Sequence, residues 1–596
     1  MYLKFKGILL ITFLFFFLTA INHGQTIPGD RSVDWTLAGC KNSLPEPDLL
    51  VNILDFGGNG DSLTDNTPAL ENAIEALNGK YGIVYFPEGT YLIKSSISLT
   101  DSVIIRGASS DMTELVFDLG EQALNCFSVS KGQTEDFSPL NRSLAKGIDV
   151  VEVLHPEFYT AGGYAEIRQE NGSWDTNPIS WADHSVGQVL KIQSVENNEL
   201  MLKNPLRINY DEELQPEIRP LEMITHVGIE CLKLSRADMP PEGAGYNFYF
   251  ANAADCHIKG VESNVSVGSH IYLTNSTNVE VSGCYIHDAC TYCGTGTRGY
   301  GLTLNMHSGE CLIENNIFKH LRHAMVAKTG ANGNVFAYNY SIEPYRVESI
   351  HDFSGDISLH GHYAFSNLFE GNIVQNIIVD HYWGPSGPYN TFFRNRAELY
   401  GFILTNSDTT QTCMQNIIGN EITNPGNFYG NYMITGTEHY EYGNNVLNNI
   451  VPAGTGNLDD ESYYLEGYID FWDISDPWPS IGIPNDLDQY TNPAKQRFIA
   501  GGQLTVCDDP VFTGSAANIN APKHDIYPNP CRGILNFRAH NNIRDIAVLN
   551  AAGHLVDVHA LSGESYALPH DIPNGLLIIR ARGESETSVH KIILQR

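Results

Sequence analysis

The sequence predicts an all-β chain whose central part is a parallel β-helix, and a repeated pattern carries this prediction. Between Ala254 and Asn420, two apolar residues are repeatedly followed by a turn-prone position that is usually Asn. The repeat units show no 3.6-residue periodicity, which excludes helical solenoids. Their anchors, spaced 23, 32, 23, 33, 23 and 25 residues apart, are Val261, Cys284, Asn316, Asn339, Asn372, Asn395 and Asn420.

An apolar column accompanies these anchors. Its members, each three positions before an anchor, are Ile258, Val281, Ile313, Phe336, Phe369, Phe392 and Ile417. Each coil of a parallel β-helix climbs about 4.8 Å, so like residues stack on like. Stacked Asn amides can hydrogen-bond one another, which offsets the free-energy cost of burying these polar groups. We therefore expect the Asn anchors to be structural.

Composition and charge narrow the range of functions. With 596 residues, 42% hydrophobic and 17% charged, the chain is folded and too long for one ordinary domain. Asp and Glu outnumber Lys and Arg by 69 to 35, a net charge of −34. This balance argues against a nucleic-acid partner, which needs a basic surface. An anionic substrate would need a local basic patch.

The N-terminus predicts export. Lys4 and Lys6 precede the apolar run from Ile8 to Leu18, which is typical of a signal peptide, here residues 1–24. No other apolar stretch is long enough to cross a bilayer, so no transmembrane segment is expected after signal removal. The eleven Cys permit disulfides in an exported protein and leave at least one thiol unpaired. We expect Cys290 and Cys293 to form a loop disulfide or to be free thiols rather than zinc ligands.

Residues 52–107 predict a cap for the β-helix. A helix is expected from Thr67 as N-cap, with Pro68 at its first position, to Asn78-Gly79. The strands GIVYFPEGTY and VIIRG follow. With the preceding DFGGNGDSLTDNT, this segment resembles the N-terminal part of the pectate-lyase superfamily of right-handed β-helices. The resemblance implies a right-handed β-helix and a helix that covers the open end of the sheet. It implies no particular reaction.

The coil rhythm divides the rest of the chain. It breaks over about residues 127–228, where a β-hairpin is expected within 189–202, so we predict a β-rich insertion in a β-helix domain spanning 45–510. Residues 452–510 show no column and are expected to wrap or cap its C-terminal end.

The last segment, residues 524–596, has its own pattern. Its YPNP at 527–530, the central Gly553 and the closing KIIL at 591–594 resemble the type A C-terminal sorting domain of the type IX secretion system of Bacteroidetes. The resemblance implies a small β-sandwich, the type IX machinery as a partner, and a secreted or cell-surface product exported through the periplasm and outer membrane.

The unequal coil spacings indicate where a substrate would bind. About ten extra residues follow Cys284, and about ten more follow Asn339. Loops projecting from alternate coils can wall a groove, and functional residues concentrate on such loops. The same region is rich in His and Arg, and polar residues follow several strand ends that stacking would bring together. We expect a polysaccharide lying along the β-helix to cross them.

Two mechanisms fit these residues. In β-elimination, a base such as Lys328 or His381 removes the proton beside a uronate carboxyl while cations neutralise the developing charge. In hydrolysis, two carboxyl groups act as acid and base, and the candidates are Asp380, Asp352, Asp288 and Glu370. The catalytic candidates overall are Lys328, Asp380, His381 and His307. The substrate-binding candidates are Arg298, Arg346, His360, His362, Trp383 and Arg394. Asp380 is also a candidate Ca²⁺ ligand, and Ca²⁺ is the only cofactor we consider.

Family motifs do not choose between the mechanisms. Ile378-Val379-Asp380-His381 resembles the WIDH motif of pectate lyases, but their RxPxxR signature is absent. The NTD and paired-Asp motifs of polygalacturonases are not found in the coil region either. We therefore expect a secreted enzyme that cleaves an acidic, uronate-bearing or sulfated polysaccharide, with lyase ahead of glycoside hydrolase. A non-catalytic polysaccharide-binding or adhesin β-helix is the third hypothesis.

Overall fold

The computed structural model describes residues 26–507, apart from 41–46, 134, 241–244, 295, 348–353, 466, 468, 470, 474, 475, 477 and 483–490, together with strands and a few adjoining residues between 525 and 594. The body within 26–507 and the C-terminal unit are described separately. The signal peptide predicted at 1–24 lies outside the described residues. Among the described residues, no helix is long and apolar enough to span a membrane.

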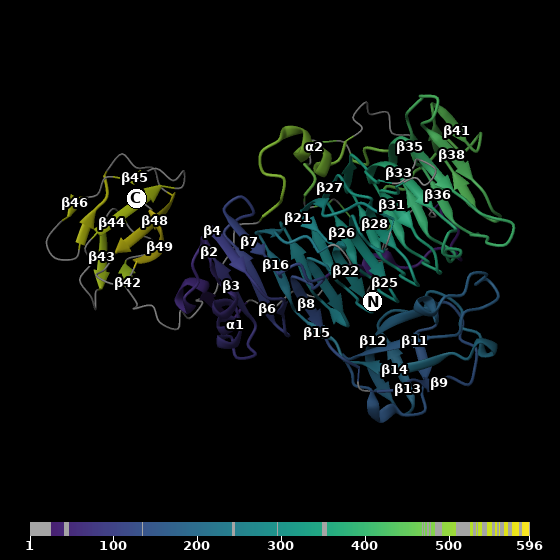
Figure 1. Ribbon diagram of the computed structural model, residues 1–596, viewed down its shortest axis with the longest axis horizontal. Coiled ribbons are helices and arrows are strands. Elements are labelled where there is room, and N and C mark those ends of the chain that lie inside the picture. The colour runs from purple at the N-terminus through teal and green to yellow at the C-terminus, as the bar shows by residue number, and fades with distance from the viewer. Residues whose placement is uncertain are drawn as a thin grey trace, which may run out of the picture. The chain divides into compact units, whose positions relative to one another are not determined.

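The body is a right-handed parallel β-helix with three faces, and most coils contribute one strand to each (Figure 1). The first face comprises β3 (Gly82–Phe86), β6 (Val103–Gly107), β16 (Gly228–Glu230), β20 (His257–Lys259), β23 (Glu280–Ser282), β26 (Leu312–Glu314), β29 (Val335–Ala337), β32 (Leu368–Glu370), β34 (Thr391–Phe393), β36 (Asn416–Ile418) and β39 (Tyr440–Tyr442).

The second face comprises β2 (Asp61–Asp65), β4 (Gly89–Ile93), β7 (Thr113–Phe117), β17 (Lys233–Arg236), β21 (Glu262–Ser266), β24 (Tyr285–Ala289), β27 (Ile317–Lys319), β30 (Tyr340–Ile342), β33 (Ile373–Val379), β35 (Arg396–Leu404), β37 (Glu421–Ile422) and β40 (Asn444–Val446). The third face comprises β5 (Ile97–Ser98), β8 (Phe127–Ser130), β18 (Phe248–Ala251), β22 (Ser269–Thr274), β25 (Tyr300–Asn305), β28 (His323–Ala327), β31 (Ile357–Leu359), the ends of β33 and β35, and β38 (Asn431–Ile434). An antiparallel hairpin of β40 with β41 (Asn449–Val451) ends the coils.

The apolar column is confirmed as the core of the first face. Its seven members are register partners on successive strands and all are fully buried. Phe336, Phe369 and Phe392 stack with ring centroids 4.8 and 5.1 Å apart, an offset geometry that adds to the energy of burial. Cys256, Cys284 and Cys311 are buried free thiols, as expected for small core residues.

Two amide ladders run up the β-helix. The predicted ladder links Asn316, Asn339, Asn372, Asn395, Asn420 and Asn444 through amide hydrogen bonds of 2.9–3.1 Å. A second ladder, which we did not predict, links Asn334, Asn367, Asn390 and Gln415 at 2.8–2.9 Å. Each of its members precedes one of four anchors by five positions, so the spacing of the repeat could also have predicted this ladder. Both ladders satisfy buried amides that would otherwise be costly.

The N-terminal helix is confirmed, with a different cap. Helix α1 spans Thr67–Ala76 and buries Thr67, Ala69, Leu70 and Ala73. Its N-cap is Asn66, not Thr67. The Thr67 hydroxyl instead accepts a hydrogen bond from the backbone N–H of Lys94 at 2.9 Å, which ties the helix to the coils.

The insertion is a six-stranded antiparallel sheet beside the β-helix (Figure 1). Its strands are β9 (Ser138–Pro139), β10 (Val150–Glu152), β11 (Tyr164–Arg168), β12 (Gly187–Glu196), β13 (Glu199–Leu202) and β14 (Glu217–Leu221). Strands β12 and β13 form the predicted hairpin. Buried polar contacts dock the insertion on the coils: Glu166 with His307, Arg207 with Glu310, and Lys191 with Asp255. These contacts make it a fixed part of the body.

The segment after the last coil runs back along the side of the β-helix. Residues such as Leu458, Tyr463 and Trp472 pack on the first face. Helix α2 (Pro493–Ala500) follows and places Ala494 against a cluster of second-face side chains. This segment therefore wraps the flank of the coils rather than only their C-terminal end.

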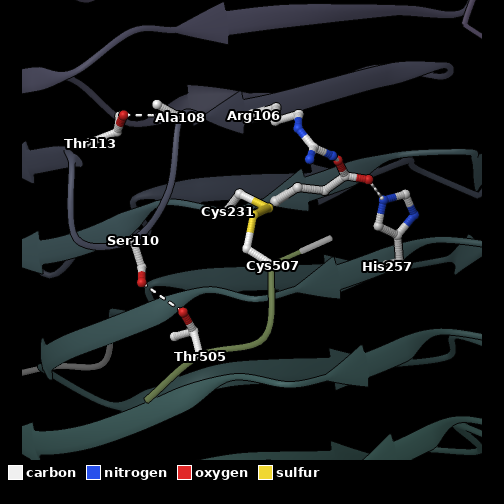
Figure 2. The surroundings of a disulfide bond; sticks show 9 residues. Arg106, Ala108, Ser110, Thr113, Cys231, His257, Thr505 and Cys507 are labelled. Atoms are coloured by element: carbon white, nitrogen blue, oxygen red, sulfur yellow. Dashed lines mark hydrogen bonds and ion pairs between the residues drawn. A yellow bond between two sulfur atoms is a disulfide. The ribbon is translucent and has the colours of Figure 1, made fainter. Parts of the chain in front are cut away.

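A disulfide fixes the end of this returning segment. Cys507 is bonded to Cys231, 276 residues earlier in the chain, and Figure 2 shows the bond between the coils and the returning segment. Nearby, the hydroxyls of Ser110 and Thr505 are 2.7 Å apart. The sequence pattern did not reveal this pairing.

The C-terminal unit contains two antiparallel sheets, as expected for the predicted small β-sandwich. One antiparallel sheet contains β42 (Asp525–Tyr527), β43 (Ile534–Arg538), β46 (His559–Ala560) and β47 (Ser565–Ala567). The other contains β44 (Asp545–Asn550), β45 (Leu555–Val556), β48 (Gly575–Arg582) and β49 (Thr587–Leu594).

Candidate active site

The strand ends of the third face bring three predicted residues into one column. Ala327, Leu359 and Val379 are register partners on β28, β31 and β33. The residue directly after each partner is polar, and these three residues are Lys328, His360 and Asp380. The parallel register therefore stacks one candidate side chain per coil. Alignment of the sequence predicted this stacking for Lys328 and Asp380, whereas the structure adds His360 between them.

A cavity of about 300 Å³ opens beside this column. Its lining residues are Trp181, Gly294, Gly296, Thr297, Tyr300, Arg322, Lys328, His360 and Trp383. The insertion contributes Trp181, and the long connection between β24 and β25 contributes Gly294, Gly296 and Thr297. One of the two long connections thus walls the site, as expected, and the insertion supplies a wall that was not foreseen.

Lys328 lines this cavity and has a pKa lowered by its surroundings. Its Nζ lies 5.6 Å from the ring centroid of Trp181 and 5.9 Å from that of Tyr272. Among the described residues, no carboxylate forms an ion pair with it. Burial disfavours the charged amine and lowers the pKa of Lys328 to about 8. A substantial fraction of this amine is therefore neutral in mildly alkaline solution.

His360 and Asp380 form a hydrogen-bonded pair next to Lys328. The His360 Nδ1 is 2.6 Å from Asp380 Oδ2. The other Asp380 oxygen accepts a hydrogen bond of 3.0 Å from the backbone N–H of Tyr382. Because Nδ1 faces Asp380, Nε2 is the ring nitrogen of His360 left for the cavity that this residue lines. The pair resembles the general arrangement of an acid–base imidazole oriented by a carboxylate.

Arg322 holds the loop wall in place. Its guanidinium donates to the carbonyl of Cys293, to that of Gly296 at 2.9 Å, and to the Tyr300 hydroxyl at 3.0 Å. Burial raises the pKa of Tyr300, and the charge of Arg322 opposes this rise. With its donors engaged in this way, Arg322 positions the loop and Tyr300.

Aromatic side chains surround the cavity mouth. The rings of Trp181 and Trp383 have centroids 5.6 Å apart, and those of Trp383 and Tyr382 are 4.8 Å apart. Trp181 is 42% exposed and Tyr382 is 70% exposed. Exposed aromatic faces of this kind can stack on sugar rings, and Trp383 was predicted to bind substrate.

Four other predicted residues lie near the cavity without lining it. His362 is buried, its Nε2 lies 3.3 Å from the carbonyl oxygen of Asn177, and its ring packs on Trp181 at 5.1 Å. It therefore supports the insertion wall. His381 pairs through Nδ1 with the Thr405 hydroxyl at 3.0 Å, in the neighbouring coil. Half-buried Arg298 and Arg346 belong to the two long connections.

Two predicted site residues are structural instead. His307 is 1% exposed, with Nδ1 2.7 Å from Glu166 Oε1 and Nε2 2.8 Å from the carbonyl oxygen of His184. It docks the insertion, so its catalytic assignment gains no support. Arg394 is buried and donates to the carbonyls of Leu458, Asp460 and Ile481. It anchors the returning segment and cannot also clamp a substrate in the cavity.

The Ca²⁺ prediction concerns Asp380 and the groups around it. Among the described residues, no three His, Cys, Asp or Glu side chains gather as metal ligands, and both Asp380 oxygens already accept hydrogen bonds. Calcium binding at Asp380 stays a prediction, and the chemistry below uses no metal.

Three aromatic residues at or beside the cavity were not predicted from the sequence. Trp181 lies in the insertion, where no repeat gives a register. Tyr300 and Tyr272 belong to third-face strands, and the column alignment that identified Leu302–Leu304 as a strand could have located Tyr300. The alignment assigns residues to strands, but it does not show in which direction a side chain points near a corner of the coil.

Comparisons with known proteins match both ends of the chain. Residues 50–142 match the family described as rhamnogalacturonase A/epimerase, pectate lyase-like, and residues 525–595 match the secretion system C-terminal sorting domain. Plasmin and fibronectin-binding protein A of Streptococcus pneumoniae (strain ATCC BAA-255 / R6) is 24% identical over 397 residues, which cover 63% of this chain and 50% of that protein. The chain thus spans about half the length of this curated relative.

Solved β-helix structures are also similar to this chain. The tailspike gp61 of Pseudomonas phage phi297 matches with 13% identity and a TM-score of 0.45, covering 66% of this chain and 73% of that one. An exopolygalacturonase from Thermotoga maritima matches with 12% identity and a TM-score of 0.37, covering 65% and 84%. The protein is a parallel β-helix with a pectate-lyase-like N-terminal segment and a type IX sorting domain that indicates export to the cell surface or the extracellular space.

Proposed function

We propose that the protein is an exported enzyme that cleaves an acidic polysaccharide by β-elimination, with Lys328 as the base. The observation that carries the proposal is the Lys328 amine. It lines a cavity on the third face, and burial lowers its pKa to about 8. An amine that is partly neutral near its working pH can accept a proton.

The reaction follows from the groups around this amine. Neutral Lys328 takes the proton from the carbon beside the uronate carboxyl, a carbon–carbon double bond forms, and the bond to the leaving sugar oxygen breaks. His360, oriented by Asp380, is placed to return a proton to that oxygen. Arg298 and Arg346 are our candidates for holding the carboxylate, since guanidinium groups suit that task.

Hydrolysis is the alternative within the same substrate class. It needs two carboxyl groups across the glycosidic bond, and Asp380 belongs to the column beside the cavity. Asp288 instead pairs with His287 on the second face at 2.8 Å, and buried Glu370 accepts hydrogen bonds from Tyr338 and Tyr463. Asp352 lies outside the described residues. This distribution favours elimination.

A binding role without catalysis is the other class of function. The curated relative is named as a plasmin- and fibronectin-binding protein, and a β-helix can present an extended surface. The converging Lys328, His360 and Asp380 favour an enzyme, because a binding surface has no use for a lysine with a lowered pKa beside an oriented imidazole.

The test is to incubate the protein with polygalacturonate, alginate and chondroitin sulfate and to follow products. We expect ultraviolet absorbance from an unsaturated uronide, and its loss in Lys328→Met. Lys319→Met is the matched control, because Lys319 ends a second-face strand away from the cavity and, among the described residues, forms one partly exposed ion pair, at 3.7 Å with Glu343. New reducing ends without absorbance would favour hydrolysis, and neither signal would favour the binding role.

A further inference from the structure

A cluster of three tyrosines lies beside Lys328 on the third face. Tyr249 and Tyr272 are register partners on β18 and β22. Tyr246 lies against both, with centroids 5.7 Å from Tyr249 and 4.5 Å from Tyr272 and interplanar angles of 15° and 16°. All three are half-buried. We call Tyr246, Tyr249 and Tyr272 the tyrosine cluster.

This cluster continues the aromatic surface of the cavity. Lys328 Nζ lies 5.9 Å from the Tyr272 ring and 5.6 Å from the Trp181 ring. Trp181 in turn packs against Trp383, and Trp383 against Tyr382. Lys328 therefore stands between two aromatic groups, with the tyrosine cluster towards the N-terminal coils and Trp181, Trp383 and Tyr382 on its other side.

The cluster also presents polar groups. Among the described residues, the hydroxyls of Tyr249 and Tyr272 have no hydrogen-bond partner. Neither hydroxyl is fully buried, so both remain accessible to solvent or to a ligand. A half-exposed phenol combines an apolar ring with a hydroxyl, which suits both the apolar faces and the hydroxyl groups of a sugar. A stack of such rings serves no evident packing need on an outer face, because the inward side chains of these strands already form the core.

We propose that the tyrosine cluster is a carbohydrate-binding subsite and that a polysaccharide chain occupies aromatic subsites on both sides of Lys328. The chain then runs along the β-helix axis, and bonds within it, rather than only at its end, reach the base. This inference rests on the proposed function for the position of the cut. The binding of sugar by the cluster stands independently of catalysis.

The test is affinity electrophoresis of the full chain in gels containing polygalacturonate, alginate or chondroitin sulfate. We expect at least one polymer to retard the wild type. The single variants Tyr249→Ala and Tyr272→Ala should each weaken that retardation roughly two- to twelvefold, the factor equivalent to about 0.5–1.5 kcal/mol of aromatic contact. The variant Tyr440→Ala should bind like the wild type, since Tyr440 stacks on Tyr442 on the first face. Circular dichroism checks that each variant is folded.

The outcomes separate this inference from the proposed function. Unchanged retardation of folded Tyr249→Ala and Tyr272→Ala overturns the subsite, as does a wild type that no polymer retards. Retardation that depends on the tyrosines without any cleavage supports the subsite and contradicts the proposed enzyme. Where the polymer is cleaved, early products of intermediate length support a chain on both sides of Lys328, and release of only the smallest fragment contradicts it.

Discussion

His360 Nδ1 lies 2.6 Å from Asp380 Oδ2, and these two residues come from adjacent coils of the β-helix. The carboxylate fixes the imidazole so that Nε2 is the nitrogen left for the cavity. In Asp380→Asn the neutral amide no longer stabilises a protonated His360, so the imidazole becomes a poorer proton donor to the leaving oxygen. We expect the turnover rate to fall roughly 10²–10⁴-fold, the usual contribution of a general acid or base, with a much smaller change in KM.

A neighbouring histidine provides the comparison for this variant. His381 pairs with the Thr405 hydroxyl and does not line the cavity, so His381→Gln should retain most of the activity. Activity that survives Asp380→Asn but not His381→Gln would reverse the assignment of the two histidines.

Lys328 predicts a particular dependence on pH. Its pKa is lowered to about 8 by burial, and only the neutral amine can act as a base. The ratio kcat/KM should therefore rise with pH and level off above about 8. In Lys328→Arg the side chain stays protonated at every accessible pH, so the positive charge remains and the base is lost.

The measurement is a pH–rate profile over the stable range of the protein. An activity that falls as pH rises towards 8 would indicate that protonated Lys328 is the working form. A Lys328→Arg variant with nearly full activity would show that charge, and not proton transfer, is what the site requires.

The contact between Glu166 and His307 predicts acid sensitivity. Burial alone would raise the pKa of Glu166, but His307 and Arg219 outweigh it and lower this pKa to about 2. A lowered carboxyl pKa stabilises the folded state above the ordinary value of about 4.5, and the stabilisation is lost as pH falls from there towards 2. Glu166→Gln leaves its partners buried and should cost about 3–5 kcal/mol at neutral pH.

Thermal unfolding of the variant at several pH values checks this prediction. The variant should have a lower Tm than the wild type at pH 7 and a weaker decline between about pH 4.5 and 2. Glu170→Gln, an exposed glutamate of the same insertion whose nearest ionic partner is 4.0 Å away, should behave like the wild type. Equal Tm values for Glu166→Gln and the wild type would contradict the docking role.

Repetition explains what the sequence could predict. The apolar column recurs in each coil from Ile258 to Ile417, and the Asn ladder recurs from Asn316 onwards, so register and burial followed from spacing alone. The same register predicted Lys328 and Asp380 at equivalent strand ends, and the structure adds His360 from the coil between them.

Contacts between non-repeating parts explain the errors. His307 and Arg394 occupy coil positions that spacing identifies correctly, but their partners come from the insertion and from the returning segment. Trp181 reaches the cavity from the insertion, where nothing in the sequence sets a register. A long-range contact of this kind has no local pattern, so the sequence could not show whether a coil residue faces substrate or another part of the chain.

The disulfide between Cys231 and Cys507 predicts how strongly the returning segment stabilises the body. It closes a loop of 276 residues, and a long loop loses much of its unfolded-state entropy when it is closed. The double variant Cys231→Ser/Cys507→Ser should lose about 2–5 kcal/mol of stability, measured as a lower Tm than the wild type without reductant. Reductant should lower the Tm of the wild type and leave that of the double variant unchanged. Cys413→Ser, which removes a free thiol, is the control. Helix α2 and the residues after it lie over the second face, so the double variant should also become more sensitive to proteolysis in this segment. Equal stability and equal cleavage of the double variant and the wild type would show that side-chain packing alone holds the returning segment.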